Sequence, residues 1–122
     1  MIPKDKICLK ATHYSGKVAI FTKKQQQLKS LKRPDLRNET WVNGRMRETI
    51  ETPTFVYEDL ARPKKRQALY LEEYRSNDRY RYTKVIVEEK ADYFFVVTAF
   101  RPDYVKERGK TKLLFGKDNE NT

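Results

Sequence analysis

Positions 79–84 read RYRYTK, an alternation of cationic and aromatic side chains that could do chemistry on a phosphate. Successive side chains of a β-strand point to opposite faces, so Thr83 would share one face with the two arginines and Lys84 the other with the two tyrosines. Cations hold phosphate, and aromatic rings stack on bases or build a core. The segment is therefore a candidate phosphate-binding strand. The alternative is a half-exposed strand that packs its tyrosines and leaves its arginines in water.

These residue types suffice for the metal-independent cleavage of RNA. That reaction removes a proton from the 2′-hydroxyl, stabilises the charge of a phosphorane and protonates a leaving oxygen. Arg and Lys stabilise the phosphorane, whereas His, Tyr or a Lys of lowered pKa moves protons. His13 is the single histidine and a candidate acid or base, and the alternative is a surface or structural histidine.

Other chemistries lack their sequence signatures. The four glycines are scattered and form no phosphate-binding loop, and no serine lies in a nucleophile elbow. Cys8 is the single cysteine, which excludes an internal disulfide and, with one histidine, disfavours a zinc site. We expect neither a metal nor another cofactor.

The charge of the chain is uneven. The 122 residues carry a net charge of +10, and residues 1–33 hold nine Lys and Arg against the single Asp5. A basic third beside a nearly neutral body is typical of a polyanion-binding face, and the alternative is a Lys-rich surface that serves solubility. No apolar run reaches the roughly 18 residues of a membrane span, and no signal peptide is recognisable. We expect a cytoplasmic protein without a membrane partner.

Two helices are predicted in the first half of the chain. The first covers positions 23–32, is capped by Thr22 and ends before Pro34. The second begins at a cap formed by Asn38 or Thr40 and ends before proline 53. Its apolar stripe is imperfect and consists of Trp41, Val42, Met46 and Ile50.

After proline 53 the apolar period becomes that of strands. Strands are predicted at 55–57, 67–75, 79–88, 93–101 and 112–115, and the short runs 7–12 and 18–22 are small strands or an entry loop. Turns are predicted at 62–65 and 76–78, with a hairpin loop at 89–92. The expected fold class is α+β, with N-terminal helices packed on one face of a four-stranded antiparallel sheet. One domain covers 1–116, and the polar residues 117–122 form a frayed tail.

Five segments carry a resemblance to a known family. They are KRPDL at 32–36, ETIETPTFV at 48–56, YTKVIV at 82–87, FVVTAFR at 95–101 and the Gly-Lys turn at 109–110. In order and spacing they resemble the barnase/EndoU/colicin/RelE-like (BECR) nuclease superfamily, in its phage-associated and mobile-element branch. The resemblance implies a BECR-like fold, toxin-like metal-independent endoribonuclease activity and an RNA substrate. It also implies a cognate antitoxin or a host protein as a partner.

The resemblance also implies site residues. Lys84 lies on the penultimate long strand, Thr98 and Arg101 on the last, and Arg33 stands where the family has a histidine at a helix end. Arginine stays protonated near neutral pH and is therefore a poor base. Either His13 or a tyrosine moves the proton, or the site has become a binding surface.

The predicted site has two parts. The catalytic group consists of His13, Tyr82, Lys84, Thr98 and Arg101, and the RNA-binding group of Arg33, Arg66, Arg79, Arg81 and Lys110. The alternative function is that of a catalytically silent relative that binds RNA, DNA or a protein partner. A phage accessory protein that inhibits a host protein is the third interpretation.

Overall fold

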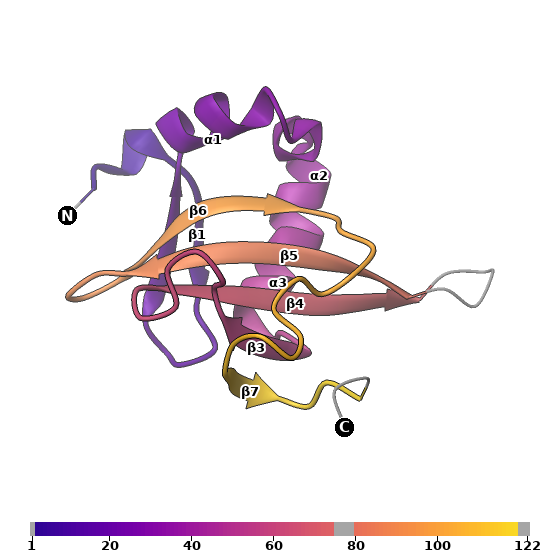
Figure 1. Ribbon diagram of the computed structural model, residues 1–122. Coiled ribbons are helices and arrows are strands. Elements are labelled where there is room, and N and C mark those ends of the chain that lie inside the picture. The colour runs from indigo at the N-terminus through magenta and orange to yellow at the C-terminus, as the bar shows by residue number, and fades with distance from the viewer. Residues whose placement is uncertain (1, 75–79, 120–122) are drawn as a thin grey trace.

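The computed structural model describes residues 2–74 and 80–119 and forms a strongly twisted sheet with helices against it (Figure 1). The first elements are η1 (Lys4–Lys6), β1 (Ile7–Thr12), β2 (Val18–Thr22), α1 (Lys23–Ser30) and η2 (Pro34–Arg37). A longer helix follows, made of α2 (Glu39–Trp41), η3 (Val42–Met46) and α3 (Arg47–Glu51). The remaining strands are β3 (Phe55–Glu58), β4 (Arg66–Tyr74), β5 (Tyr80–Glu89), β6 (Phe94–Phe100) and β7 (Leu113–Gly116). The fold class is α+β, as predicted.

The sheet has seven strands in the order β1-β2-β6-β5-β4-β3-β7, and this corrects the predicted four-stranded antiparallel sheet. The predicted meander forms its middle, β6-β5-β4-β3. The hairpin β1–β2 extends it at one edge through a parallel pairing of β2 with β6, where Ala19 lies opposite Phe94. β7 extends the other edge, pairing antiparallel with β3. The short apolar runs at the N-terminus are therefore strands of the main sheet.

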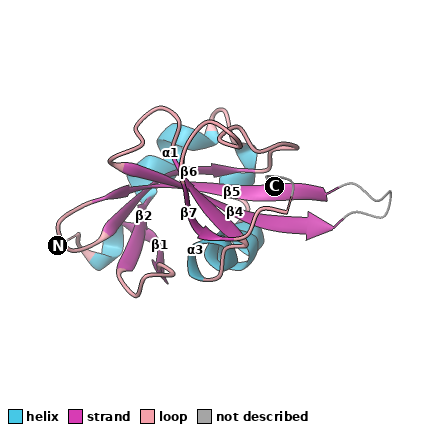
Figure 2. Cartoon of the chain, turned by 60° about the horizontal axis from the view of Figure 1, so that its bottom comes forward, coloured by secondary structure: helices cyan, strands magenta, loops and turns pink. Residues whose placement is uncertain are grey.

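The sheet curls so far that its two edges approach each other. Tyr14, in the β1–β2 turn, lies 4.6 Å from the ring of Phe115 in β7, measured between ring centroids. Figure 2 shows the strands fanning out rather than lying flat, as the right-handed twist of β-strands requires. The curled sheet wraps the second helix on one face and leaves the opposite face to the C-terminal segment.

The second helix contains a π-helical turn at Val42–Met46, and this turn explains its imperfect apolar stripe. In a regular α-helix, residues four apart drift by about 40° around the axis. A π-turn accommodates an extra residue and opposes that drift. Trp41, Val42, Met46 and Ile50 are consequently all buried on the sheet. Asn38 caps the helix by accepting a hydrogen bond from the Trp41 N–H, so of the two predicted caps Asn38 is the one used.

Two apolar clusters lie on the two faces of the sheet. The larger, between the sheet and the second helix, includes Leu36, Met46, Ile50, Val85 and Val96. The smaller lies on the opposite face and consists of Phe55, Tyr57, Ala68, Tyr70, Tyr82 and Val105. Within the described ranges no helix is long and apolar enough to cross a bilayer.

The predicted frayed tail starts as an anchored segment. Asp118 is 3% exposed, accepts a hydrogen bond from the Tyr57 hydroxyl at 2.8 Å and binds Arg108. A buried carboxylate needs such partners. The described residues 117–119 therefore belong to the folded domain, and residues 120–122 lie outside the described part.

Candidate nucleic-acid interface

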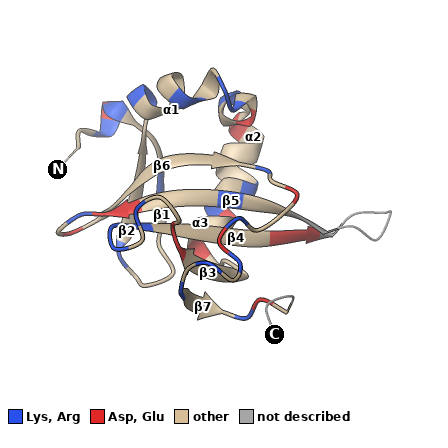
Figure 3. Ribbon diagram, in the orientation of Figure 1, with Lys and Arg blue, Asp and Glu red and all other residues tan. Residues whose placement is uncertain are grey.

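A row of Lys and Arg positions, which we call the basic ridge, follows α1 and η2 at one side of the sheet (Figure 3). Helix α1 begins at Thr22, whose hydroxyl accepts a hydrogen bond from the Gln25 N–H. It is tied to β6 by the Gln25 side-chain amide, which donates to the Val97 carbonyl at 2.7 Å. The basic ridge consists of Lys23, Lys24, Lys29, Lys32, Arg33 and Arg37. In the part of the chain that the structure describes, none of these six forms an ion pair, so their charge faces solvent.

A pocket of about 370 Å³ opens where the ridge meets β6, and we call it the Arg33 pocket. Its lining residues are Leu28, Lys29, Leu31, Lys32, Arg33 and Thr98. The Arg33 guanidinium lies 4.1 Å from the centre of the Phe100 ring, which is a cation–π contact. The Thr98 hydroxyl oxygen is buried and has no hydrogen-bond partner within the described residues. Leu28 and Leu31 remain 60% and 76% exposed.

This combination fits a nucleotide. Arg33, Lys29 and Lys32 can neutralise a phosphate, and the two leucines offer apolar surface to a base or ribose. A buried hydroxyl without a partner costs free energy that a ligand's polar atom recovers. The pocket therefore has the groups that a phosphate-bearing chain requires.

Lys84 lies on the same sheet face as the pocket but is closed off from solvent. Its Nζ lies 3.0 Å from Oε2 of Glu107, and the two side chains are 4% and 0% exposed. The Tyr70 hydroxyl donates to the other oxygen of Glu107. Burial, followed by the hydrogen bond to that carboxylate, raises the pKa of Tyr70 well above its ordinary value. Tyr70 is therefore a fixed donor.

Tyr82 packs beside this ion pair in the smaller core cluster. Its ring lies 5.7 Å from that of Tyr70, edge to face, and its hydroxyl accepts a hydrogen bond from Arg108 at 3.2 Å. Arg108 in turn binds both carboxylate oxygens of Asp118, at 2.8 and 3.0 Å. Tyr82 is 3% exposed and has a packing role in this structure.

Three residues that the family resemblance singles out meet around Phe100. Lys84 lies opposite Phe100 in the β5–β6 pairing, and its Nζ is 5.6 Å from the centre of that ring. Thr98 lies two residues before Phe100 on β6, and Arg33 stacks on the same ring. The structure thus brings Arg33, Thr98 and Lys84 together.

His13 lies elsewhere, in the turn after β1. It is 1% exposed and stacks on Phe94 with ring centres 3.8 Å apart. Its Nδ1 accepts from the Ser15 N–H, and its Nε2 lies 2.8 Å from the amide oxygen of Gln67. Because that oxygen only accepts, Nε2 carries the proton. Burial holds the pKa of His13 below its ordinary value, partly offset by the bond to Gln67.

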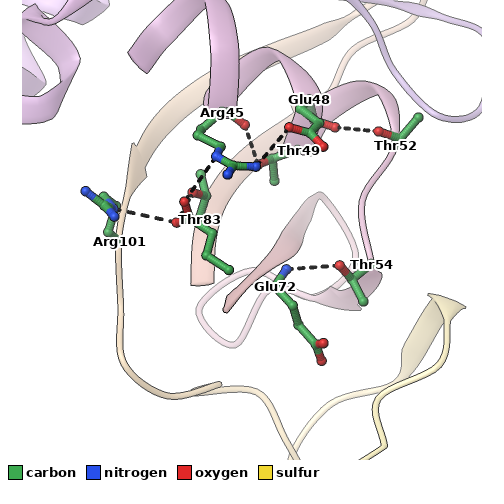
Figure 4. A network of polar contacts seen from close by, with 9 residues as sticks. Arg45, Glu48, Thr49, Thr52, Thr54, Glu72, Thr83 and Arg101 are labelled. Atoms are coloured by element: carbon green, nitrogen blue, oxygen red, sulfur yellow. Dashed lines mark hydrogen bonds and ion pairs between the residues drawn. The ribbon is translucent and has the colours of Figure 1, made fainter. Parts of the chain in front are cut away.

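Arg101 is also separate from the pocket. Its Nε lies 3.6 Å from the Glu73 carboxylate, which also pairs with Arg45 at 3.2 Å and accepts a hydrogen bond from Thr83 at 2.8 Å. Figure 4 shows this network between η3 and the ends of β4 and β6. Thr83 and its neighbour Lys84 point to opposite faces of β5, so Arg101 and Lys84 do not share a site.

The remaining predicted RNA-binding residues are dispersed. Arg66 donates to Glu88 at 2.8 Å, and hydrogen bonds from Lys90 and Arg66 lower the pKa of Glu88 to about 2. Lys110 is exposed in the segment before β7. Arg79 and the side chain of Arg81 lie outside the described residues.

Two carboxylates that hold predicted cations, Glu107 and Glu73, were not predicted from the sequence. The position of Glu73 could have been predicted, because the register of the β4–β5 hairpin places it diagonally opposite Thr83 on one face. Glu107 lies in an irregular segment, where no periodicity indicates a partner. The exposed leucines of the pocket were likewise missed, since α1 shows little apolar stripe.

Within the described ranges, no group of three or more His, Cys, Asp or Glu side chains is placed to hold a metal ion. No family model matches this chain, and comparisons with curated proteins and with solved structures give no match.

Proposed function

We propose that the protein binds single-stranded RNA through the basic ridge, with a backbone phosphate held in the Arg33 pocket. The observation that carries this proposal is a set of cations around a buried Thr98 hydroxyl, for which the described residues supply neither an acidic partner nor a hydrogen bond. A single strand can present an unstacked nucleotide to a pocket, whereas a duplex encloses its bases. RNA is the nucleic acid that the family resemblance favours.

Binding is favoured over catalysis because the proton carriers are enclosed. His13 has both ring nitrogens engaged, and Tyr82 lies in a core cluster. No histidine, carboxylate or tyrosine lines the described pocket. The pocket cations can stabilise negative charge, but no group suited to take a proton near neutral pH lines the described pocket.

The second candidate is a metal-independent endoribonuclease. The convergence of Arg33, Thr98 and Lys84 around Phe100 favours it. In this reading Arg33 and Lys84 stabilise the phosphorane and Thr98 orients the phosphate.

One experiment separates the two candidates. Wild type, Arg33→Ala and the control Lys64→Ala are incubated with a labelled, mixed RNA pool in excess EDTA. The binding module retains intact RNA in a salt-sensitive complex, and Arg33→Ala weakens that complex while Lys64→Ala does not. Products with cyclic-phosphate ends that disappear in Arg33→Ala establish the nuclease. Intact RNA without any complex contradicts both candidates and favours a protein partner.

A further inference from the structure

Residues 102–111, which we call the strap, cross the sheet face opposite the second helix and lie over Lys84 (Figure 1). Where the strap begins, the Pro102 carbonyl accepts a hydrogen bond from the Tyr82 N–H at 3.1 Å. Directly after it, the Lys112 carbonyl accepts from the Glu58 N–H at 2.9 Å. The strap itself has no strand or helix.

Between these ends the backbone of the strap bonds to itself. The N–H groups of Lys110 and Thr111 both donate to the Glu107 carbonyl, at 2.9 and 3.1 Å. The Arg108 N–H donates to the Val105 carbonyl. No sheet ladder must break for this part to lift, so its closure depends on side chains.

The deepest of those side chains is Glu107. Its carboxylate is fully buried and receives the Lys84 ammonium and the Tyr70 hydroxyl. Val105 packs beside it in the smaller core cluster, while Tyr104 and Lys106 on either side are exposed. An ammonium and a hydroxyl around one carboxylate are also the donors that a phosphate oxygen would use.

The position occupied by Glu107 lies close to the Arg33 pocket. Phe100 links the two, because Lys84 Nζ lies 5.6 Å and the Arg33 guanidinium 4.1 Å from the centre of its ring. Successive phosphates of a single strand are spaced by several ångströms, so one strand can reach both positions.

We propose that the strap is autoinhibitory: Glu107 occupies an anion site at Lys84 and Tyr70 that an RNA phosphate takes when the strap lifts. This inference rests on the proposed RNA binding. RNA and the Glu107 carboxylate then compete for Lys84, and the docked strap lowers the affinity of the whole ridge. Removing the charge of Glu107 weakens the competitor and leaves the site intact.

The first test compares Glu107→Gln with the control Asp92→Asn, which changes the net charge equally at an exposed loop position. Affinity for a fluorescent 12-nucleotide oligouridine is measured by anisotropy, after thermal unfolding has shown that each variant is folded. Glu107→Gln binds about tenfold more tightly than Asp92→Asn, because a charged competitor has been made neutral. Adding Lys84→Met to Glu107→Gln removes the gain.

The second test uses the wild type, which keeps the inference falsifiable if Glu107→Gln does not fold. Hydrogen exchange of the Tyr82 amide, which donates to the Pro102 carbonyl of the strap, is followed with and without the oligouridine, with Val85 in β5 as the reference. Lifting the strap breaks that bond, so RNA accelerates exchange of the Tyr82 amide and leaves that of Val85 unchanged. Unchanged or slower Tyr82 exchange on bound RNA overturns the inference.

The two proposals fail differently. If the wild type binds RNA and Glu107→Gln binds no more tightly than Asp92→Asn, the strap inference is wrong and RNA binding stands. If neither protein binds RNA, the proposed function is wrong and the strap inference falls with it.

Discussion

The two cationic regions that contact Phe100 contrast in how their charges are satisfied. The Arg33 pocket has Arg33, Lys29 and Lys32 without acidic partners in the described structure and beside exposed leucines. Lys84, one ring away, is buried against Glu107 and Tyr70. A buried cation must be neutralised within the fold, whereas an exposed cation is available to a ligand. Cations of similar appearance in the sequence are therefore neutralised within the fold in one region and available to a ligand in the other.

The largest effect is expected when the buried ion pair between Lys84 and Glu107 is broken. Lys84→Met leaves Glu107 buried without its counter-ion, and it should lower the free energy of unfolding by about 3–5 kcal/mol. Urea denaturation measures this change. The double variant Lys84→Met/Glu107→Leu should recover much of the loss, because no buried charge remains. A Lys84→Met protein as stable as the wild type would show that the pair is not buried.

A second test of the interior concerns His13 and pH. Its pKa is lowered in the folded state, so the unfolded chain binds the proton more readily. Its contribution to stability is complete above the unfolded pKa of about 6.5 and is lost as the pH falls below that value towards the folded pKa. The expected slope is at most about 1.4 kcal/mol per pH unit, measured by denaturation from pH 8 to 5. The variant His13→Gln should lack this component, and an identical slope in that variant would contradict the assignment.

Thr98→Val tests the role of the hydroxyl in the Arg33 pocket. The hydroxyl makes no hydrogen bond in the described structure, so its removal should leave stability unchanged or slightly higher. RNA affinity should fall by about 1 kcal/mol, or roughly fivefold, if the ligand uses that hydroxyl. Paired measurements of melting temperature and RNA anisotropy check both halves. Lost stability with unchanged affinity would assign Thr98 to packing alone.

A similarly small effect is expected at the cap that positions the ridge. Thr22→Ala removes the side-chain acceptor for the Gln25 N–H and should destabilise the protein by about 1 kcal/mol. Thr22→Ser keeps the acceptor and should be nearly neutral. Thermal denaturation of both variants distinguishes loss of the cap from loss of the methyl group.

The elements of this fold were largely readable from local chemistry. The caps at Thr22 and Asn38 and the alternation through β5 and β6 depend on neighbours in the sequence, so periodicity found them. The parallel pairing of β2 with β6 was not readable, because it joins residues more than 70 positions apart and requires the sheet to curl.

The candidate site was readable only in part. Arg33, Thr98 and Lys84 were singled out and do converge, whereas Arg101 and His13 lie in other parts of the fold. Arg101 is separate because its partners lie on the other face of β5, and His13 is separate because it lies in the turn after β1. The burial of Glu107 was not predicted, because it lies in an irregular segment whose sequence has no periodic pattern of apolar residues.

The most direct test of the central claim is the salt dependence of RNA binding by two triple variants. Lys29→Ala/Lys32→Ala/Arg33→Ala removes the pocket cations, and Lys64→Ala/Lys112→Ala/Lys117→Ala removes three exposed charges elsewhere. Log affinity for oligouridine is plotted against log salt concentration. Each lost phosphate contact lowers the slope by about 0.7, so the pocket variant should lose at least about 0.7 units for the phosphate held in the pocket, while the control keeps nearly all of its slope. Equal losses in both variants would mean that the protein attracts RNA by net charge alone and would contradict a binding site at the Arg33 pocket.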